Sequence, residues 1–231
     1  GLIYAGCRLG RMLYLQRKFA EAKKLYGRFL SRYPDDPMLS AFTVEAMGNS
    51  DNIQEASQMA LRLKNALSSS SKGLCASGYI HLRQGEFHRA IALLSQAKAA
   101  GPENVDVDFY LGQALLQAGD YERAIDVFNQ LVRCCPQNPR YYASLGAVYK
   151  KSGQLMQASI AMQTALSKNS SDISVMIDLS QIWIEMKYFR NALHILDKAM
   201  EINPEIPEIY INKAIALWHT GEIAESKKLL N

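Results

Sequence analysis

The 231-residue chain has an ordinary globular composition, with 48% hydrophobic and 21% charged residues, so it can bury a substantial core. Its 26 basic and 22 acidic residues give a net charge of +4, which is too small and too dispersed to indicate binding to nucleic acid or to an anionic membrane surface. No apolar run approaches the roughly 18 to 20 residues needed to cross a bilayer, so we expect no membrane insertion.

The sequence repeats every 34 residues, in seven rows that begin at residues 3, 37, 71, 105, 139, 173 and 207 without an insertion. Two positions of the row are almost entirely small. Position 8 holds Gly10, Val44, Gly78, Gly112, Gly146, Ser180 and Ala214, and position 20 holds Ala22, Ala56, Ala90, Ala124, Ala158, Ala192 and Ser226. Positions 17 and 24 are large and apolar in most rows, so each row is a variant of one packing unit.

Each row is predicted to form two antiparallel α-helices, a first and a second helix. At about 100° per residue, positions 4, 7, 8 and 11 lie on one side of the first helix, and positions 17, 20, 24 and 27 lie on one side of the second. The small residues let the two helices approach closely while their large neighbours fill the remaining space.

Glycine and proline mark the predicted ends of the helices. Glycine at position 15 can adopt a positive φ and end the first helix, and proline at position 32 stops the second. These residues are Gly85, Gly119, Gly153 and Gly221 at position 15, and Pro34, Pro102, Pro136 and Pro204 at position 32. Asp36 before Pro37 and Asn138 before Pro139 are typical caps at helix starts.

The fourth row shows the pattern most clearly. It contains, in order, Leu111, Gly112, Gly119, Tyr121, Ala124, Phe128 and Pro136. This combination in a 34-residue frame resembles the tetratricopeptide repeat (TPR) family. The resemblance covers repeats 3–36, 37–70, 71–104, 105–138, 139–172, 173–206 and a partial 207–231. It implies an all-α fold, a right-handed α-solenoid of antiparallel helix pairs, as a single domain over residues 3–231 whose concave surface is lined by the first helices.

Two rows depart from the family pattern, and we expect them to pack more loosely. Row two has Thr43, Val44 and Ser68 where the family has leucine, a small residue and proline, and row seven has Lys213 at a core position. The run 68–71 is expected to be a soft joint between rows. Because row seven stops before its second helix is complete and no polar capping helix follows, we expect a fragment of a longer chain that self-associates through its uncapped ends.

The cysteines and histidines argue against a catalytic or metal site. Cys7 and Cys75 share position 5 two rows apart, on the order of 20 Å, too far for a disulfide or a shared metal. Adjacent Cys134 and Cys135 could form only a strained ring, and His81 is expected to be partly buried and hydrogen-bonded. No nucleophile, nucleotide or zinc motif occurs, so we expect no enzyme activity, no cofactor and no metal. Reduced thiols favour a cytoplasmic location, although the compartment stays open.

The family resemblance implies that positions 2, 5, 9, 12 and 13 of the first helices face a ligand. In rows three to five these positions are mixed, basic and aromatic, and in rows six and seven they are strongly apolar. The candidate partner-binding residues are Tyr79, Arg83, Phe109, Gln113, Leu116, Lys150, Lys151, Ile177, Ile184, Ile211, Ile215 and Trp218. The alternative is that positions 5 and 12 merely pack neighbouring first helices, or that a further row covers Trp218. Position 5 contains no lysine, which disfavours the carboxylate clamp of chaperone-binding members.

These features favour a non-enzymatic scaffold or adaptor that binds a peptide or helix of a partner protein in the concave groove. Lys72, Arg140, Lys150 and Lys151 are placed to meet an acidic partner, but no aromatic residues interleave with them for base stacking, so we expect no nucleic-acid binding. Two alternatives stay open. The chain could be the recognition arm of a larger enzyme, such as a repeat-bearing glycosyltransferase, or a self-assembling structural solenoid.

Overall fold

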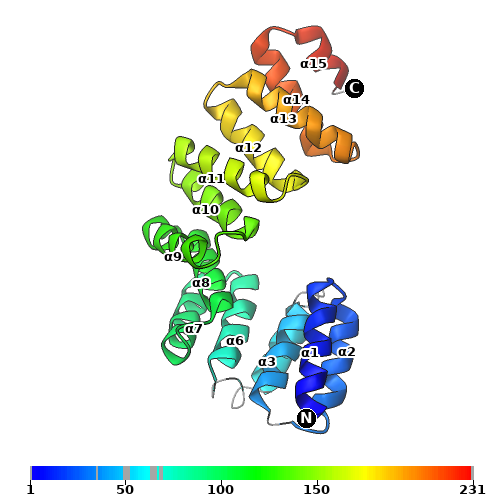
Figure 1. The fold of residues 1–231 in the computed structure, drawn as a ribbon, viewed down its shortest axis with the longest axis vertical. Helices are drawn as coiled ribbons and strands as arrows, with labels where there is room; N and C mark the ends of the chain where they lie inside the picture. Colours follow the sequence, from blue (N-terminus) through cyan, green and yellow to red (C-terminus); the bar gives the residue numbers. More distant parts are fainter. Residues whose placement is uncertain (1, 35, 49–52, 63–66, 68–69, 230–231) are drawn as a thin grey trace. The chain divides into compact units, whose positions relative to one another are not determined.

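The computed structural model describes residues 2–34, 36–48, 53–62, 67 and 70–229, and over these residues all 14 regular elements are α-helices (Figure 1). The chain divides into two compact units, Gly1–Asp120 (unit 1) and Tyr121–Asn231 (unit 2). The predicted all-α solenoid class is confirmed. The handedness of the solenoid and the single-domain organisation of residues 3–231 stay predictions.

Unit 1 contains three complete helix pairs and one further first helix. Its helices are α1 (Leu2–Leu15), α2 (Phe19–Leu30), α3 (Pro37–Gly48), α4 (Ile53–Arg62), α6 (Ser71–Arg83), α7 (Phe87–Ala100) and α8 (Val105–Ala118). Each helix contacts the next in the chain from α1 to α4 and from α6 to α8, and the first helices also contact one another in the order α1, α3, α6, α8. The first helices therefore form one continuous layer of unit 1.

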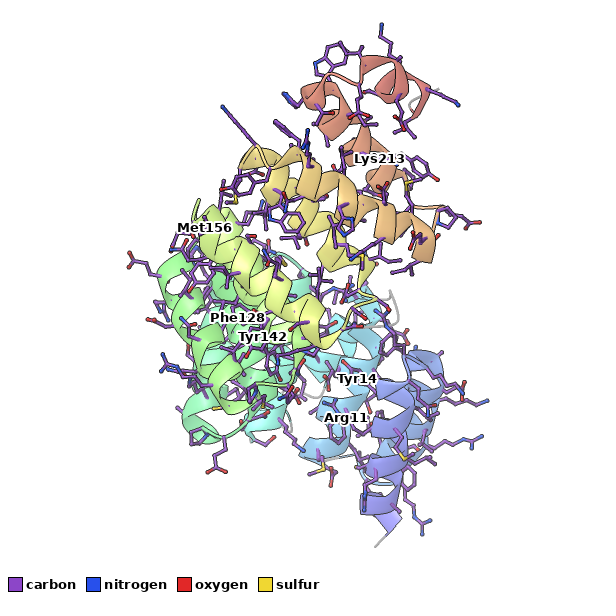
Figure 2. The ribbon with its side chains drawn as sticks, turned by 45° about the horizontal axis from the view of Figure 1, so that its top comes forward. Arg11, Tyr14, Phe128, Tyr142, Met156 and Lys213 are labelled. Carbon is purple, nitrogen blue, oxygen red and sulfur yellow. The ribbon has the colours of Figure 1, made fainter. Side chains whose placement is uncertain are left out.

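Unit 2 repeats this arrangement. Its helices are α9 (Tyr121–Cys134), α10 (Pro139–Lys151), α11 (Leu155–Lys168), α12 (Ile173–Glu185), α13 (Phe189–Ile202), α14 (Pro207–Thr220) and α15 (Ile223–Leu229). Each helix contacts the next, and the first helices α10, α12 and α14 also contact one another in that order. Figure 2 shows that large side chains such as Phe128 lie among the helices, and Phe128 has no exposed surface.

The small residues at positions 8 and 20 lie where two helices of a pair touch, as predicted. All six alanines at position 20 are completely buried. A methyl group added at Gly78 would lie 2.6 Å from Cγ of Leu94, and one added at Gly146 would lie 2.9 Å from Cγ of Met162. Leu94 and Met162 both occupy position 24 of their rows, so the small and the large residue of each pair fit against each other.

The turn after a first helix has a positive φ at position 15 in each of the six rows where the structure describes that residue. The four glycines at position 15 have the values 79° at Gly85, 83° at Gly119, 79° at Gly153 and 93° at Gly221. The same position is occupied by Arg17 with φ 61° and by Lys187 with φ 64°. The turn therefore keeps its positive φ even at Arg17 and Lys187, whose Cβ atoms make this conformation unfavourable.

The predicted caps are also confirmed. The Asp36 carboxylate accepts a hydrogen bond from the backbone N–H of Leu39 at 2.8 Å, and the Asn138 side chain accepts one from Arg140 at 3.1 Å. Each cap satisfies an N–H group that has no partner within its own helix.

The departures in row two do not loosen α3. Thr43 and Val44 are 2% and 0% exposed, and the Thr43 hydroxyl donates to the carbonyl of Leu39 at 2.7 Å. The prediction of looser packing is therefore wrong at these two positions. Lys213 in α14 (Figure 2) forms an ion pair with Asp197 at 2.7 Å, so its charge is paired although only 16% of its side chain is exposed. Residues 68–69 of the predicted joint lie outside the described residues.

Candidate functional site

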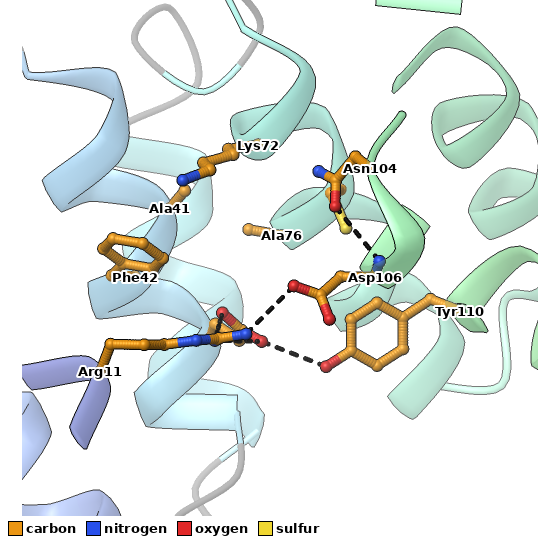
Figure 3. A pocket seen from close by; sticks show the side chains of 10 residues that line it. Arg11, Ala41, Phe42, Lys72, Ala76, Asn104, Asp106 and Tyr110 are labelled. Carbon is orange, nitrogen blue, oxygen red and sulfur yellow. Dashed lines mark hydrogen bonds and ion pairs between the residues drawn. The ribbon is translucent and has the colours of Figure 1, made fainter. Parts of the chain in front are cut away.

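A network of charged and phenolic side chains joins three first helices of unit 1. Arg11 of α1 lies 3.3 Å from the carboxylate of Glu45 in α3 and 3.0 Å from that of Asp106 in α8 (Figure 3). The Tyr110 hydroxyl donates to Glu45 at 3.1 Å. Only 13% of the Glu45 side chain is exposed, so its charge is satisfied by neighbours from other helices instead of by bulk water.

The burial of this network shifts its acid–base equilibria. Burial raises the pKa of Glu45 above its ordinary value, an effect that the Arg11 cation opposes and the Asp106 carboxylate reinforces. Burial disfavours the charged form of Arg11, but Glu45 and Asp106 more than compensate, and the pKa of Arg11 is raised. Burial also raises the pKa of Tyr110. Arg11 therefore stays a cation, and Tyr110 stays a hydrogen-bond donor.

A pocket of about 210 Å³ opens beside this network. Its lining residues belong to first helices, apart from Asn104, which directly precedes α8; they are Arg11, Ala41, Phe42, Glu45, Lys72, Cys75, Ala76, Asn104, Asp106 and Tyr110. Figure 3 shows Ala76 between Lys72 and Asp106. The small side chains form a depression between residues of opposite charge, and the Lys72 ammonium lies 5.0 Å from the centre of the Phe42 ring, within the range of a cation–π interaction.

Unit 2 contains an exposed apolar surface on α14. Ile211, Ile215 and Trp218 are 49%, 41% and 54% exposed and line a depression of about 340 Å³. His219, also on its edge, stacks on Phe189 with ring centres 4.7 Å apart. The structure thus brings together the three apolar candidates that the sequence placed in row seven.

Three tetratricopeptide repeat family models match residues 4–36, 75–139 and 127–158, which together make up about half of the chain. The chain is a tetratricopeptide repeat protein. The repeat architecture expected from the sequence is therefore confirmed, while the count of seven repeats stays a prediction.

The TPR chain is similar to longer proteins. It is 21% identical over 185 residues to the mouse (Mus musculus) BBSome complex member BBS4, covering 65% of this chain and 36% of that protein. It is 21% identical over 224 residues to mouse tetratricopeptide repeat protein 21A, covering 94% of this chain and 17% of that protein. The TPR chain thus spans about a third or less of these relatives.

Solved structures show the same fold. The structure of the APC/C hetero-tetramer Cut9–Hcn1 matches with a TM-score of 0.78 at 17% identity, over 92% of the TPR chain and 42% of the other chain. YrrB, described as a TPR protein with an unusual peptide-binding site, matches with a TM-score of 0.61 at 16% identity, over 81% and 97%. At these identities the likeness shows the fold alone.

Two of the other candidate residues of the TPR chain are buried. Tyr79 and Phe109 are only 5% and 3% exposed, and each packs its ring against Tyr110, with centres 4.8 Å and 5.7 Å away. Arg83 donates to the Tyr79 hydroxyl at 2.9 Å. Tyr79 and Phe109 therefore offer almost no surface to a partner, and we leave them out of the proposed binding surface.

Two candidates in unit 2 contact neighbouring helices. The Lys150 ammonium bonds to Asp178 at 3.3 Å and to Gln181 at 2.5 Å, both on α12, so its charge is satisfied inside the unit. Ile177 packs against an apolar cluster that includes Ile209 of α14. Lys150 at position 12 and Ile177 at position 5 therefore contact neighbouring first helices, which agrees with the alternative that these positions pack first helices together. Among the rest, Gln113, Leu116 and Ile184 are half-buried and Lys151 is exposed.

Sequence reasoning missed the network of unit 1. Arg11 and Glu45 both occupy position 9, and Asp106 occupies position 2, so all three lie at ligand-facing positions. Rows one and two, which contain Arg11 and Glu45, supplied no candidate, and Asp106 was not among the candidates of row four. Opposite charges at position 9 of consecutive rows were the available signal. Phe42 and Tyr110 share position 6, which lies outside the implied set.

The cysteines and histidines lie as the sequence suggests. All four cysteines are free thiols, and Cys7 and Cys75 are buried. The His81 ring lies 3.0 Å from the Glu86 carboxylate with its side chain 30% exposed, which confirms a partly buried, hydrogen-bonded histidine. Within the described ranges we find no cluster of three or more His, Cys, Asp or Glu side chains that could hold a metal ion. In the same part of the chain no helix is long and apolar enough to cross a membrane.

Proposed function

We propose that this TPR protein is a non-enzymatic scaffold or adaptor that binds a segment of a partner protein on its first-helix face. The observation that supports this most directly is the pocket of unit 1, because its lining comes from the layer of four first helices α1, α3, α6 and α8. The names of similar proteins also support a role in protein–protein interaction, because BBS4 is a BBSome complex member and Cut9 belongs to a hetero-tetramer.

The size of the pocket favours a side chain over a free small molecule. Pockets for drug-sized ligands measure about 300–1,000 Å³, whereas this one measures about 210 Å³. Ala41, Cys75 and Ala76 give it an apolar floor. Lys72 and Asp106 give its rim both signs of charge, and 51% of the Asp106 side chain is exposed. The segment that fits best inserts one apolar side chain and carries charged residues on either side of it.

Affinity capture with a charge-reversed rim tests this proposal. The 231-residue protein, its Lys72→Glu variant and a Lys24→Glu control would be used to capture proteins from a native lysate. Lys24 is exposed on the second helix α2, so the control makes the same charge change on unit 1 away from the pocket.

We expect at least one captured protein to be retained by Lys24→Glu and lost with Lys72→Glu. For that protein in purified form, Lys72→Glu should weaken Kd by about tenfold or more, since charges at an interface select partners and affect association. Circular dichroism would verify that both variants are folded. If Lys72→Glu captures the same proteins with the same Kd as Lys24→Glu, the pocket is not the binding site.

A further inference from the structure

The helix α11 of unit 2 turns an apolar, almost uncharged face to solvent. Met156 (Figure 2) and Ile160, one helical turn apart, are 54% and 59% exposed. Among the second helices that the structure describes, α11 is the one whose sole charged residue is its last, Lys168. The Lys168 ammonium lies 3.3 Å from the side-chain oxygen of Gln137 and 5.5 Å from the centre of the Tyr142 ring, both outside α11. Exposed apolar side chains on a surface depleted of charge are typical of the centre of a protein interface.

The stacking of repeats leaves this face of α11 uncovered. Of the described helices, α11 contacts the first helices α10 and α12 and does not contact the second helices α9 and α13. Met156 and Ile160 occupy positions 18 and 22 of row five, and at about 100° per residue these positions lie opposite the core positions 20, 24 and 27. A repeat added at either end of the stack would follow the same pattern, so it would not cover this face.

The second helices before and after α11 carry opposite charges along their outer sides. Figure 1 shows α9, α11 and α13 in this order along unit 2. The outer positions 18, 22 and 29 hold, in that order, Glu122, Asp126 and Arg133 on α9 and Arg190, His194 and Glu201 on α13. All of these residues are exposed. The apolar face of α11 therefore lies between two charged edges whose signs are opposite at positions 18 and 29, with a carboxylate and an imidazole at position 22.

The neighbouring outer positions contain no like charges on α9 and α13. Position 19 holds Arg123 and Asn191, position 25 holds Asn129 and Asp197, and position 26 holds Gln130 and Lys198, with the α9 residue first in each pair. If α9 of one molecule lies alongside α13 of another in the same direction, each of these positions therefore brings a charged group next to a neutral one.

Two copies of this face match each other in one orientation. A two-fold axis parallel to α11 sets Met156 and Ile160 of the two molecules against each other and places α9 of each molecule alongside α13 of the other. The opposite charges at positions 18 and 29 then face each other, and each pair forms twice. An axis perpendicular to α11 would instead place α9 against α9, and when centred on the apolar side chains it would set Glu122 against Asp126, which is repulsive. The charges therefore favour the parallel pairing.

We propose that two molecules of this protein form a two-fold symmetric dimer through the outer face of unit 2, with α11 packed parallel to α11. Such an isologous contact uses the same surface on both molecules, so association stops at the dimer. One helix and the edges of two others make a small interface, below about 1,200 Å² in total, so the dimer should be weak, with a micromolar Kd. The interface contains none of the pocket residues of unit 1, so it is independent of partner binding there, and the dimer carries two copies of that pocket.

Sedimentation velocity on the whole 231-residue protein, from low to high micromolar concentration, tests the apolar contact. The wild type should approach twice the monomer mass of 25.8 kDa, whereas Met156→Glu combined with Ile160→Glu should stay monomeric. The matched control combines Leu9→Glu with Met12→Glu on α1; these residues are 51% and 58% exposed, and the control should associate as the wild type does. All of these positions are exposed, so the variants should fold, which circular dichroism would verify.

Three results of this experiment would overturn the proposal. The first is a wild type that stays monomeric over the whole range or grows beyond the dimer. The second is a variant at Met156 and Ile160 that dimerises as the wild type does. The third is a loss of association in the α1 control, which would show that any added charge on an exposed apolar surface prevents association.

Charge reversal tests the parallel orientation. Glu122→Arg and Arg190→Glu each set like charges against each other twice, so each single variant should weaken the dimer by about five- to thirtyfold. The variant that carries both substitutions restores opposite charges and should dimerise as the wild type does. An equimolar mixture of the two single variants should associate more tightly than either alone, because each then meets its complement. A mixture no tighter than its components, or a double variant as weak as the single ones, contradicts the parallel pairing.

Discussion

Replacing Lys187 with glycine should stabilise unit 2. Lys187 has φ 64° at position 15, where the glycines of other rows have φ between 79° and 93°. The left-handed conformation costs a residue with a Cβ roughly 1–2 kcal/mol, whereas glycine adopts it freely. The greater freedom of glycine in the unfolded chain offsets about 0.4–1 kcal/mol of that gain. The net expectation for Lys187→Gly is a stabilisation of about 0.5–1 kcal/mol.

Urea denaturation followed by circular dichroism measures this effect as a higher midpoint at an unchanged slope. For a chain of this length the thermal midpoint should rise by about 1–4 °C. Lys187→Ala is the control, because it removes the same exposed side chain but keeps the Cβ and therefore the strain. If alanine stabilises as much as glycine, the gain comes from losing the lysine and not from φ. A glycine variant less stable than the wild type would refute the reasoning.

Two further predictions concern packing and buried charge in unit 1. Gly78→Ala should cost about 1–3 kcal/mol of unfolding free energy, because the new methyl group meets Leu94 at 2.6 Å. Gly27→Ala in α2 has nothing within 4 Å and should stabilise by about 0.5–1 kcal/mol, so equal effects of the two substitutions contradict the close-contact explanation. Because burial raises the folded-state pKa of Glu45, the folded state binds that proton more tightly than the unfolded state. The unfolding free energy of the wild type should therefore fall relative to that of Glu45→Gln as pH rises from the ordinary glutamate pKa through the raised value. Urea unfolding at several pH values measures this difference. If the wild type instead becomes more stable relative to Glu45→Gln as pH rises, the pKa of Glu45 is shifted in the opposite direction.

The helices could be predicted from the sequence because each depends on residues close to it in the chain. Val105, Pro139 and Ile173 begin α8, α10 and α12 at the first residue of their rows. The alternation of small and large residues requires one particular pairing of helices, and Ala158 at such a contact is completely buried. Where the glycine signal is missing, at Lys187, the turn keeps its positive φ, since the two helices that it joins dictate its course.

The network of unit 1 could not be predicted in this way. Arg11 and Asp106 are 95 residues apart and come from rows one and four. Whether they meet depends on how far each repeat rotates relative to the last, and small rotations accumulate along a solenoid. The row pattern records which side of its helix each residue occupies, but it contains no measure of that rotation.

The same limit explains why repeat position alone did not separate packing residues from surface residues. Ile177 and Ile211 both occupy position 5, yet Ile177 packs against an apolar cluster while Ile211 is 49% exposed. Lys150 and Trp218 both occupy position 12, and only Lys150 is engaged by a neighbouring first helix. Position therefore specifies which face a residue lies on, and the neighbouring helix determines whether that face is covered. Ile211 and Trp218 are therefore the candidates at these two positions whose side chains are exposed, whereas Ile177 and Lys150 are used in contacts between helices.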